Sequence, residues 1–88
     1  MTPPMLEMTF RRGRPFAAYL HLGPTGTKAK RTRKLAPSLI GDFDKNGELL
    51  GLEILAFDRG TVARINPILE AHGRAALPAK ELAPLRAA

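Results

Sequence analysis

The chain has no cysteine and no tryptophan, and its 88 residues include one tyrosine and four phenylalanines. The missing cysteine excludes a disulfide framework, a cysteine-ligated zinc site and thiol chemistry. The small number of aromatic rings leaves little material for platforms on which nucleic-acid bases could stack. A chain of this length forms one domain with a modest core. We therefore expect self-association or a partner chain to add stability.

Long apolar runs are also missing. No segment approaches the roughly 18 apolar residues of a membrane-spanning helix. The N-terminus lacks the apolar stretch behind a basic start that marks a secretory signal. We expect a cytoplasmic protein that does not enter a membrane, and the absence of cysteine fits a reducing compartment.

Positive charge is in excess, and it is unevenly distributed. The formal net charge is +6. Residues 1–34 hold eight Lys and Arg against one acid, a balance of +7, whereas residues 35–88 hold six against seven, a balance of −1. The eight basic residues are Arg11, Arg12, Arg14, Lys28, Lys30, Arg31, Arg33 and Lys34. They predict nucleic-acid binding as one candidate function, with a solvated surface as the simpler alternative.

Short strand-like runs separated by glycine and proline fill the first two thirds of the chain. The expected strands cover residues 5–10, 16–22, 27–35, 39–43 and 49–55, and the basic run at 27–35 is expected at a sheet edge. Asn66 and Pro67 resemble a helix start, with Thr61 as an earlier alternative that would leave Pro67 as a kink. Gly73 is expected to end this helix.

This pattern predicts an α+β fold, in which a small antiparallel sheet of four to five strands, meander-like, carries a C-terminal helix packed on one face. We expect a flexible N-terminus at residues 1–4 and a single domain at residues 5–73. The Ala- and Pro-rich tail at residues 74–88 is expected to be partly helical or disordered.

The segment from Asp42 to Glu53 supports two incompatible interpretations. Asp42, Asp44, Asn46, Glu48 and Glu53 occupy the ligand positions of the calcium-loop pattern D-x-[DN]-x-[DN]-G-x5-E. Alternatively, Asp44, Asn46 and Gly47 form the turn of a β-hairpin. Pro37 and Gly41 are poor residues for the helix that must lead into a calcium loop, and no second loop of this kind is present. The hairpin is therefore favoured.

The turn also predicts a strand register. Counting outward from it, Phe43 faces Leu49 and Gly41 faces Gly51. Opposed glycines in strands indicate a close approach by another element or a strong twist. In this register Asp42 and Glu53 point to opposite faces, and we expect each to pair with a nearby arginine. The candidate partners are Arg31, Arg33 and Arg64.

No group of residues predicts catalysis. General acid–base chemistry needs two groups that converge on one pocket, and Asp42 and Glu53 are expected on opposite faces. His21 and His72 are far apart, and neither has a second metal ligand at helical or hairpin spacing. We expect no catalytic residue, no cofactor and no resident metal.

The string from Asp42 to Leu55, preceded by Tyr19-Leu20-His21-Leu22, resembles the YuzE-like family of small bacterial domains of unknown function. The resemblance covers roughly residues 5–72. It departs at Phe10 to Arg14, where basic residues replace the family's acidic segment. The resemblance implies a compact α+β domain, often one half of a two-gene module similar to toxin–antitoxin pairs. No catalytic residues are carried over.

Together these observations predict a non-enzymatic interaction module that forms a homodimer or pairs with a small partner protein. An antitoxin-like role is its more specific form. Nucleic-acid binding through the basic half is the first alternative, and calcium binding by the segment from Asp42 to Glu53 is the second.

Overall fold

The computed structural model describes residues 3–24 and 26–88, which contain five strands and three helices. The strands are β1 (Met5–Arg11), β2 (Arg14–His21), β3 (Arg31–Ala36), β4 (Leu39–Phe43) and β5 (Leu49–Ile54). The helices are α1 (Arg59–Ala63), α2 (Ile65–Ala71) and α3 (Ala79–Arg86). The flexible segment expected at residues 1–4 falls partly on residues 1 and 2, which lie outside the described residues.

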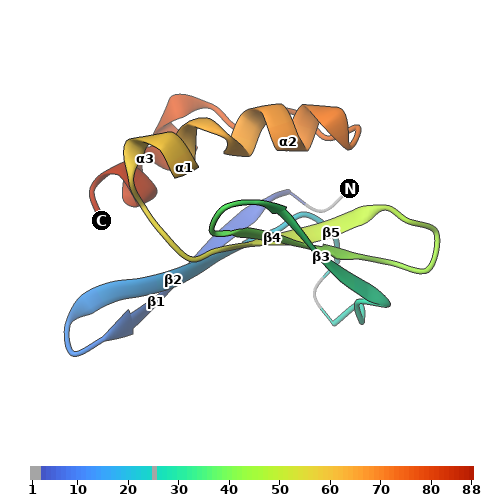
Figure 1. Cartoon of the computed structure of the whole chain (residues 1–88), viewed down its shortest axis with the longest axis horizontal. Coiled ribbons are helices and arrows are strands. Elements are labelled where there is room, and N and C mark those ends of the chain that lie inside the picture. Colours follow the sequence, from blue (N-terminus) through green and yellow to red (C-terminus); the bar gives the residue numbers. More distant parts are fainter. Residues whose placement is uncertain (1–2, 25) are drawn as a thin grey trace.

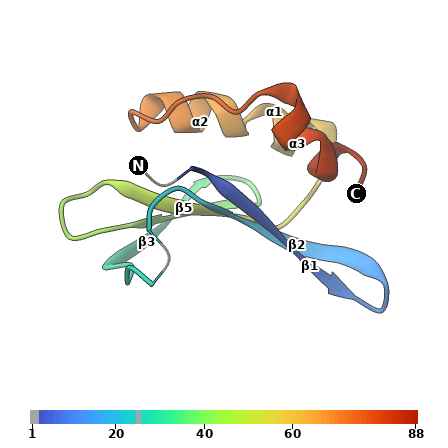
Figure 2. The same cartoon turned by 180° about the vertical axis from the view of Figure 1, so that it is seen from behind.

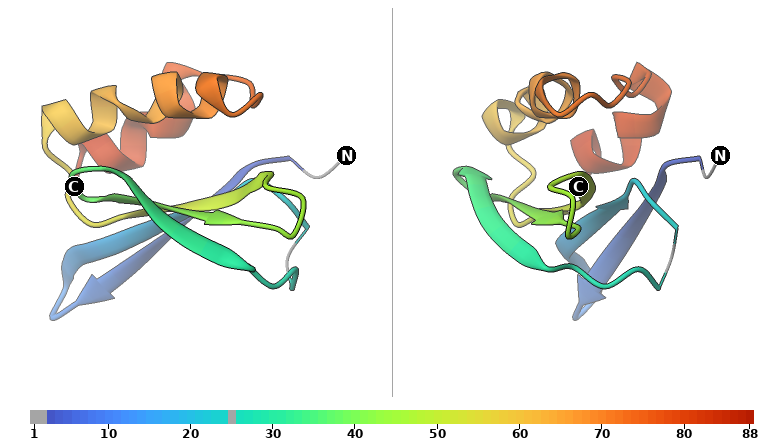
Figure 3. Two further views of the ribbon diagram at one scale, coloured as in Figure 1. Left: turned by 45° about the vertical axis from the view of Figure 1, so that its right-hand side comes forward. Right: turned by 90° about the vertical axis from the view of Figure 1, so that its right-hand side faces the viewer.

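All five strands pair antiparallel in one sheet with the order β1-β2-β5-β4-β3. Strands β3, β4 and β5 follow one another as a meander, and β5 then lies against β2 of the β1–β2 hairpin. The helices form a second layer over one face of the sheet and leave the other face uncovered (Figure 1 and Figure 2). The two views in Figure 3 show the same two layers. The α+β fold is confirmed.

Alternating burial along the strands shows which residues face the helices. On β4, Leu39 and Phe43 are buried, whereas Ile40 and Asp42 between them are half-buried on the other face. The buried apolar core consists of Ala18, Leu20, Leu22, Leu39, Phe43, Leu49, Leu52, Ile54, Val62, Ile65, Leu69, Leu82 and Leu85. Burial of one large side chain of this kind contributes about 1.5–3 kcal/mol. This core therefore holds the helical layer on the sheet.

Residues 39–54 form the β4–β5 hairpin, which confirms the hairpin interpretation of this segment. The backbone N–H of Gly47 donates to the Asp44 carbonyl at 3.0 Å. Asp44 Oδ1 accepts the backbone N–H groups of Asn46 at 2.8 Å and Glu48 at 2.9 Å. Gly47 has φ of +81°, the left-handed conformation that such a turn requires. The side chain of Asp44 therefore serves the turn.

The hairpin register differs from the predicted one beyond the first pair. Phe43 faces Leu49 as expected, but the pairing shifts between Asp42 and Phe43, so that Asp42 faces Gly51 and Gly41 faces Leu52. The prediction that Gly41 faces Gly51 is wrong, because Leu50 is an extra, bulged residue. Its carbonyl accepts the backbone N–H groups of Leu22 at 2.9 Å and Gly23 at 3.2 Å.

The shift also changes the face on which Glu53 lies. Glu53 faces Ile40 on β4 and Tyr19 on β2. Ile40 and Asp42 share the uncovered face because they are two residues apart on one strand. Asp42 and Glu53 therefore lie on the same face, and the prediction of opposite faces is wrong.

The first helix begins earlier than predicted. Asp58 is the N-cap of α1, and its carboxylate accepts the Thr61 hydroxyl at 2.6 Å and the Thr61 backbone N–H at 3.1 Å. These hydrogen bonds lower the pKa of Asp58 below its ordinary value. Asn66 and Pro67 lie inside α2. The prediction of Asn66 as an N-cap is wrong because the chain is already helical at Arg64.

The end of α2 is a Schellman motif. Gly73 has φ of +74°. Its backbone N–H donates to the Glu70 carbonyl at 3.1 Å, and the Arg74 N–H donates to the Leu69 carbonyl at 2.8 Å. Gly73 therefore ends the helix in the way the sequence predicts.

The Ala- and Pro-rich tail contains α3, which joins the core through Leu82 and Leu85. The Asn66 side chain holds the segment that leads to this helix. Its Nδ2 donates to the Leu77 carbonyl at 3.0 Å, and its Oδ1 accepts the Leu77 N–H at 2.8 Å. None of the helices in the described part of the chain has the length and apolar character needed to cross a membrane.

Candidate functional site

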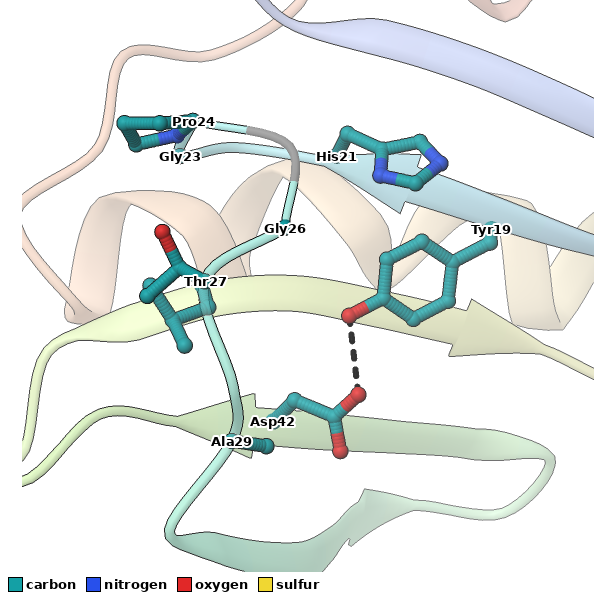
Figure 4. Close-up of a pocket in the computed structure, with 9 residues that line it drawn as sticks. Tyr19, His21, Gly23, Pro24, Gly26, Thr27, Ala29 and Asp42 are labelled. Atoms are coloured by element: carbon teal, nitrogen blue, oxygen red, sulfur yellow. Dashed lines mark hydrogen bonds between the residues drawn. The ribbon is translucent and has the colours of Figure 1, made fainter.

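A network of polar side chains occupies the uncovered face of the sheet. The Tyr19 hydroxyl on β2 donates a 2.8 Å hydrogen bond to Asp42 Oδ2 on β4 (Figure 4). The Thr32 hydroxyl on β3 donates to Asp42 Oδ1, also at 2.8 Å. Each oxygen of the Asp42 carboxylate therefore has one donor. The first bond passes over β5, which lies between β2 and β4.

Gly51 on β5 makes room for the Tyr19 ring. A Cβ atom placed at Gly51 would overlap the hydroxyl oxygen and two ring carbons of Tyr19. Gly51 also faces Asp42 on one side and His21 on the other. The close approach that the strand glycines indicated is therefore made by an aromatic side chain of the same sheet.

Tyr19 is held in its protonated form. Burial of the ring raises the pKa of Tyr19 above its ordinary value of 10.0, and the hydrogen bond to Asp42 raises it further. The negative charges of Asp42 and Glu53 act in the same direction. The hydroxyl is consequently a hydrogen-bond donor at neutral pH.

His21 extends the network toward the β1 edge. Its Nε2 lies 3.0 Å from Glu7 Oε1, and its ring meets the Tyr19 ring edge-on with 4.7 Å between centroids. The Glu7 side chain is 64% exposed, so water screens this pair and it adds little stability. The contact orients the His21 ring beside Tyr19.

A small open pocket of about 310 Å³ adjoins these side chains. Tyr19, His21 and Asp42 line it together with Leu50, and the segment leading from β2 to β3 forms its other wall (Figure 4). That segment contributes Gly23, Pro24, Gly26, Thr27 and Ala29. The pocket thus combines an aromatic ring, an imidazole and a carboxylate with a wall of small residues.

Tyr19 is a poor general base in this arrangement. A general base acts with a pKa close to the working pH, whereas the pKa of Tyr19 is shifted away from neutrality. A carboxylate beside an aromatic ring is typical of sites for cationic groups, which gain both ionic and cation–π attraction. The arrangement fits an ammonium or guanidinium group.

The arginines predicted to pair with Asp42 lie elsewhere. Arg33 faces Gly41 on β4, and its guanidinium carbon lies 4.8 Å from the centre of the Phe43 ring. Among the described residues, the one ion pair within 4.0 Å joins His21 and Glu7. The prediction of an arginine partner for Asp42 is wrong, because tyrosine and threonine hydroxyls supply its hydrogen bonds.

The structure divides the eight basic residues of the N-terminal half. Arg11, Arg12 and Arg14 lie at the tip of the β1–β2 hairpin. The others lie on β3 and the segment before it, toward the opposite end of the molecule (Figure 1). The residues of this second group are Lys28, Lys30, Arg31, Arg33 and Lys34. They do not form one continuous surface with the first three.

The calcium-pattern residues are dispersed over the hairpin. Asp42 is bound to Tyr19 and Thr32, and Asp44 is bound to backbone N–H groups of its own turn. Glu53 lies on β5 opposite Ile40. No three His, Asp or Glu side chains gather in the described part of the chain in a way that could hold a metal ion.

Sequence reasoning identified Asp42 but not its partner Tyr19. The two residues are 23 positions apart, and no local pattern connects them. The usable signal was Gly51, because a glycine inside a strand marks a close approach. His72, the other histidine, packs against Phe43 on the helix-covered side of the sheet, with 5.3 Å between ring centroids.

Residues 17–57 match the model of a family described as a protein of unknown function (DUF2283). The matched segment contains most of β2 and all of β3, β4 and β5, and therefore Tyr19, Thr32, Asp42 and Gly51. No curated protein and no solved structure matches the chain.

Proposed function

We propose that this chain is a non-enzymatic interaction module that binds a small partner protein through the uncovered face of its sheet. The observation that carries this proposal is the Tyr19–Asp42 pocket, a half-buried carboxylate beside an aromatic ring on a face without helices. The resemblance to the YuzE-like domains supports an antitoxin-like role in a two-gene module, with the pair located in the cytoplasm.

The partner contributes a lysine or arginine side chain to this pocket. Asp42 and Glu53 lie on the same face, and neither has a Lys or Arg within ion-pair distance among the described residues. A cationic group placed beside the Tyr19 ring would be attracted by both carboxylates and by the ring face. Charge complementarity of this kind raises the association rate and suppresses wrong partners.

The same charges disfavour a symmetric dimer centred on this pocket. A twofold axis close to Asp42 and Glu53 would place these residues of one copy against the same residues of the other, and like charges in close contact repel. A homodimer would more readily form along β1, an exposed seven-residue edge strand. Sedimentation equilibrium measures this self-association directly.

Co-expression with the product of the adjacent gene tests the proposal. Asp42→Asn removes the negative charge and keeps the side-chain shape. We expect at least about tenfold weaker retention of the partner, because one member of a buried charge pair is lost. Glu81→Gln makes the same charge change on exposed α3 and should leave retention unchanged. Equal retention of the partner by both variants would contradict the proposal.

Nucleic-acid binding is the second candidate function. It is supported by a basic pocket beside β3, in which Lys30, Arg31 and Arg33 lie close to Lys45 of the hairpin turn. The basic hairpin tip of Arg11, Arg12 and Arg14 would then add a separate, weaker contact to phosphates.

A further inference from the structure

The end of the sheet formed by the start of β3 and the β4–β5 turn contains a pocket of about 360 Å³. Four cationic side chains line it, and they come from three places in the chain. Lys30 precedes β3, Arg31 and Arg33 lie on β3, and Lys45 lies in the turn between β4 and β5. Lys45 lies outside the basic half of the sequence. Only the fold brings it to this group.

The backbone around the pocket is well defined. The Lys30 N–H donates to the Phe43 carbonyl at 2.8 Å, and Arg31 faces Phe43 across the β3–β4 ladder. Arg31 and Arg33 are two residues apart on one strand and therefore project to the same side of the sheet. The Arg33 guanidinium lies over the Phe43 ring at 4.8 Å. This stacking orients the guanidinium and leaves its N–H donors free to bind a ligand.

Positive charge is in excess around the pocket. Four cations and one acid line it, the acid being Asp44, whose Oδ1 accepts two backbone N–H groups of the turn. None of the four cations forms an ion pair within 4.0 Å in the described part of the chain. An external anion bound among them would reduce their mutual repulsion.

We propose that this pocket binds a phosphate group. A phosphate presents several oxygens in different directions, so cations from separate elements can each contact it, whereas a planar carboxylate is matched by one guanidinium. The phosphate comes either from a nucleic-acid backbone or from a small phosphorylated compound. This inference deepens the second candidate function by assigning the contact to four residues, and it is independent of the Tyr19–Asp42 pocket.

Titration of the full chain with pyrophosphate at low ionic strength, followed by amide chemical shifts, tests the assignment. We expect shifts concentrated at Lys30, Arg31 and Gly47. Arg31→Gln combined with Arg33→Gln should weaken binding at least about tenfold, since each lost charge-assisted contact accounts for a factor of this order. The matched control is Arg11→Gln with Arg12→Gln, which removes the same charge at the hairpin tip and should change binding less than about twofold.

A second arm uses a fluorescent oligothymidine and distinguishes the two phosphate sources. If the phosphate belongs to nucleic acid, the oligonucleotide binds more tightly than pyrophosphate. The variant with Arg31→Gln and Arg33→Gln then loses more affinity for the oligonucleotide than the hairpin-tip control. Pyrophosphate binding without oligonucleotide binding supports the pocket and contradicts nucleic-acid binding. If both variants weaken oligonucleotide binding equally and pyrophosphate causes no chemical-shift changes, the assignment of a phosphate to this pocket is wrong. Nucleic-acid binding by the chain would still stand. Binding of polyglutamate in place of both phosphate ligands overturns the proposal in favour of an acidic protein partner.

Discussion

The hydroxyl of Tyr19 reaches Asp42 Oδ2 at 2.8 Å over the backbone of Gly51. The hydrogen bond connects β2 with β4, which are not neighbours in the sheet because β5 lies between them. A side chain on β5 at this position would block the bond. This hydrogen bond therefore depends on Tyr19, Asp42 and Gly51, which come from three different strands.

The first prediction concerns the space above Gly51. Gly51→Ala places a methyl group where the Tyr19 ring lies, so we expect the free energy of unfolding to fall by about 1–3 kcal/mol from overpacking. In a Tyr19→Ala background the clash is absent, and the same substitution should be neutral or stabilising by up to about 1 kcal/mol. Urea denaturation of the native chain, the two single variants and the double variant gives the coupling energy between positions 19 and 51. If Gly51→Ala lowers the unfolding free energy equally in both backgrounds, the Tyr19 ring is not what it clashes with.

The second prediction concerns pH. Burial and the hydrogen bond to Asp42 raise the pKa of Tyr19 above 10.0, so the folded chain holds this proton more tightly than the unfolded chain. The stabilisation associated with this proton is complete below about pH 10 and is lost as the pH rises above that value. We expect the free energy of unfolding to fall more steeply at alkaline pH in the native chain than in Tyr19→Phe.

The tyrosinate absorbance provides a direct reading of this titration, because Tyr19 is the one tyrosine of the chain. It should appear at a higher pH in the folded protein than in urea. If the free energy of unfolding falls equally at alkaline pH in the native chain and in Tyr19→Phe, groups other than Tyr19 cause the pH dependence.

The third prediction separates the turn role of Asp44 from metal binding. Asp44→Ala removes the acceptor for the Asn46 and Glu48 N–H groups and should cost about 1–2 kcal/mol in unfolding free energy. Asp44→Asn keeps an acceptor oxygen and should cost less. Millimolar calcium should leave the melting temperature and the Gly47 amide shift unchanged. A calcium-dependent Gly47 shift that Asp44→Ala abolishes would restore the calcium interpretation.

The fourth prediction concerns the C-terminal tail. Leu85 is 1% exposed, so Leu85→Ala should destabilise the protein by about 2–5 kcal/mol through lost burial and a residual cavity. Lys80→Ala on the exposed side of α3 should change stability by less than about 0.5 kcal/mol. Thermal and urea unfolding measure both. Similar stabilities for the two variants would mean that α3 does not contribute to the core.

Local backbone chemistry made several elements predictable. Asp44 and Gly47 identified the hairpin turn, and Gly73 identified a helix end, because a few neighbouring residues determine whether a left-handed conformation is tolerated. The start of α1 was missed although Asp58 is a favourable N-cap residue. Asn66 and Pro67 together are a stronger helix-start pattern than Asp58 alone. However, the Asn66 side chain binds the Leu77 backbone and does not cap a helix.

Register was harder to predict than strand position. The bulge at Leu50 moves Asp42 opposite Gly51, and its carbonyl is used by the chain after β2 rather than by the hairpin itself. The residues of the turn do not indicate that the Leu50 carbonyl will bind Leu22 and Gly23, which are far away in the sequence. One extra residue was enough to reverse the predicted face of Glu53, since side chains alternate along a strand.

By itself, the amino-acid sequence determined the strands, the hairpin turn, the end of α2 and the excess of positive charge, because these depend on residues close together in the chain. Only the tertiary structure decided that β5 lies between β2 and β4, that Tyr19 meets Asp42 over Gly51, and that Lys45 joins Arg31 and Arg33. Strand order and register follow from burying one shared apolar core beneath the helices. Contacts between residues 23 positions apart are set by that burial and not by local preference.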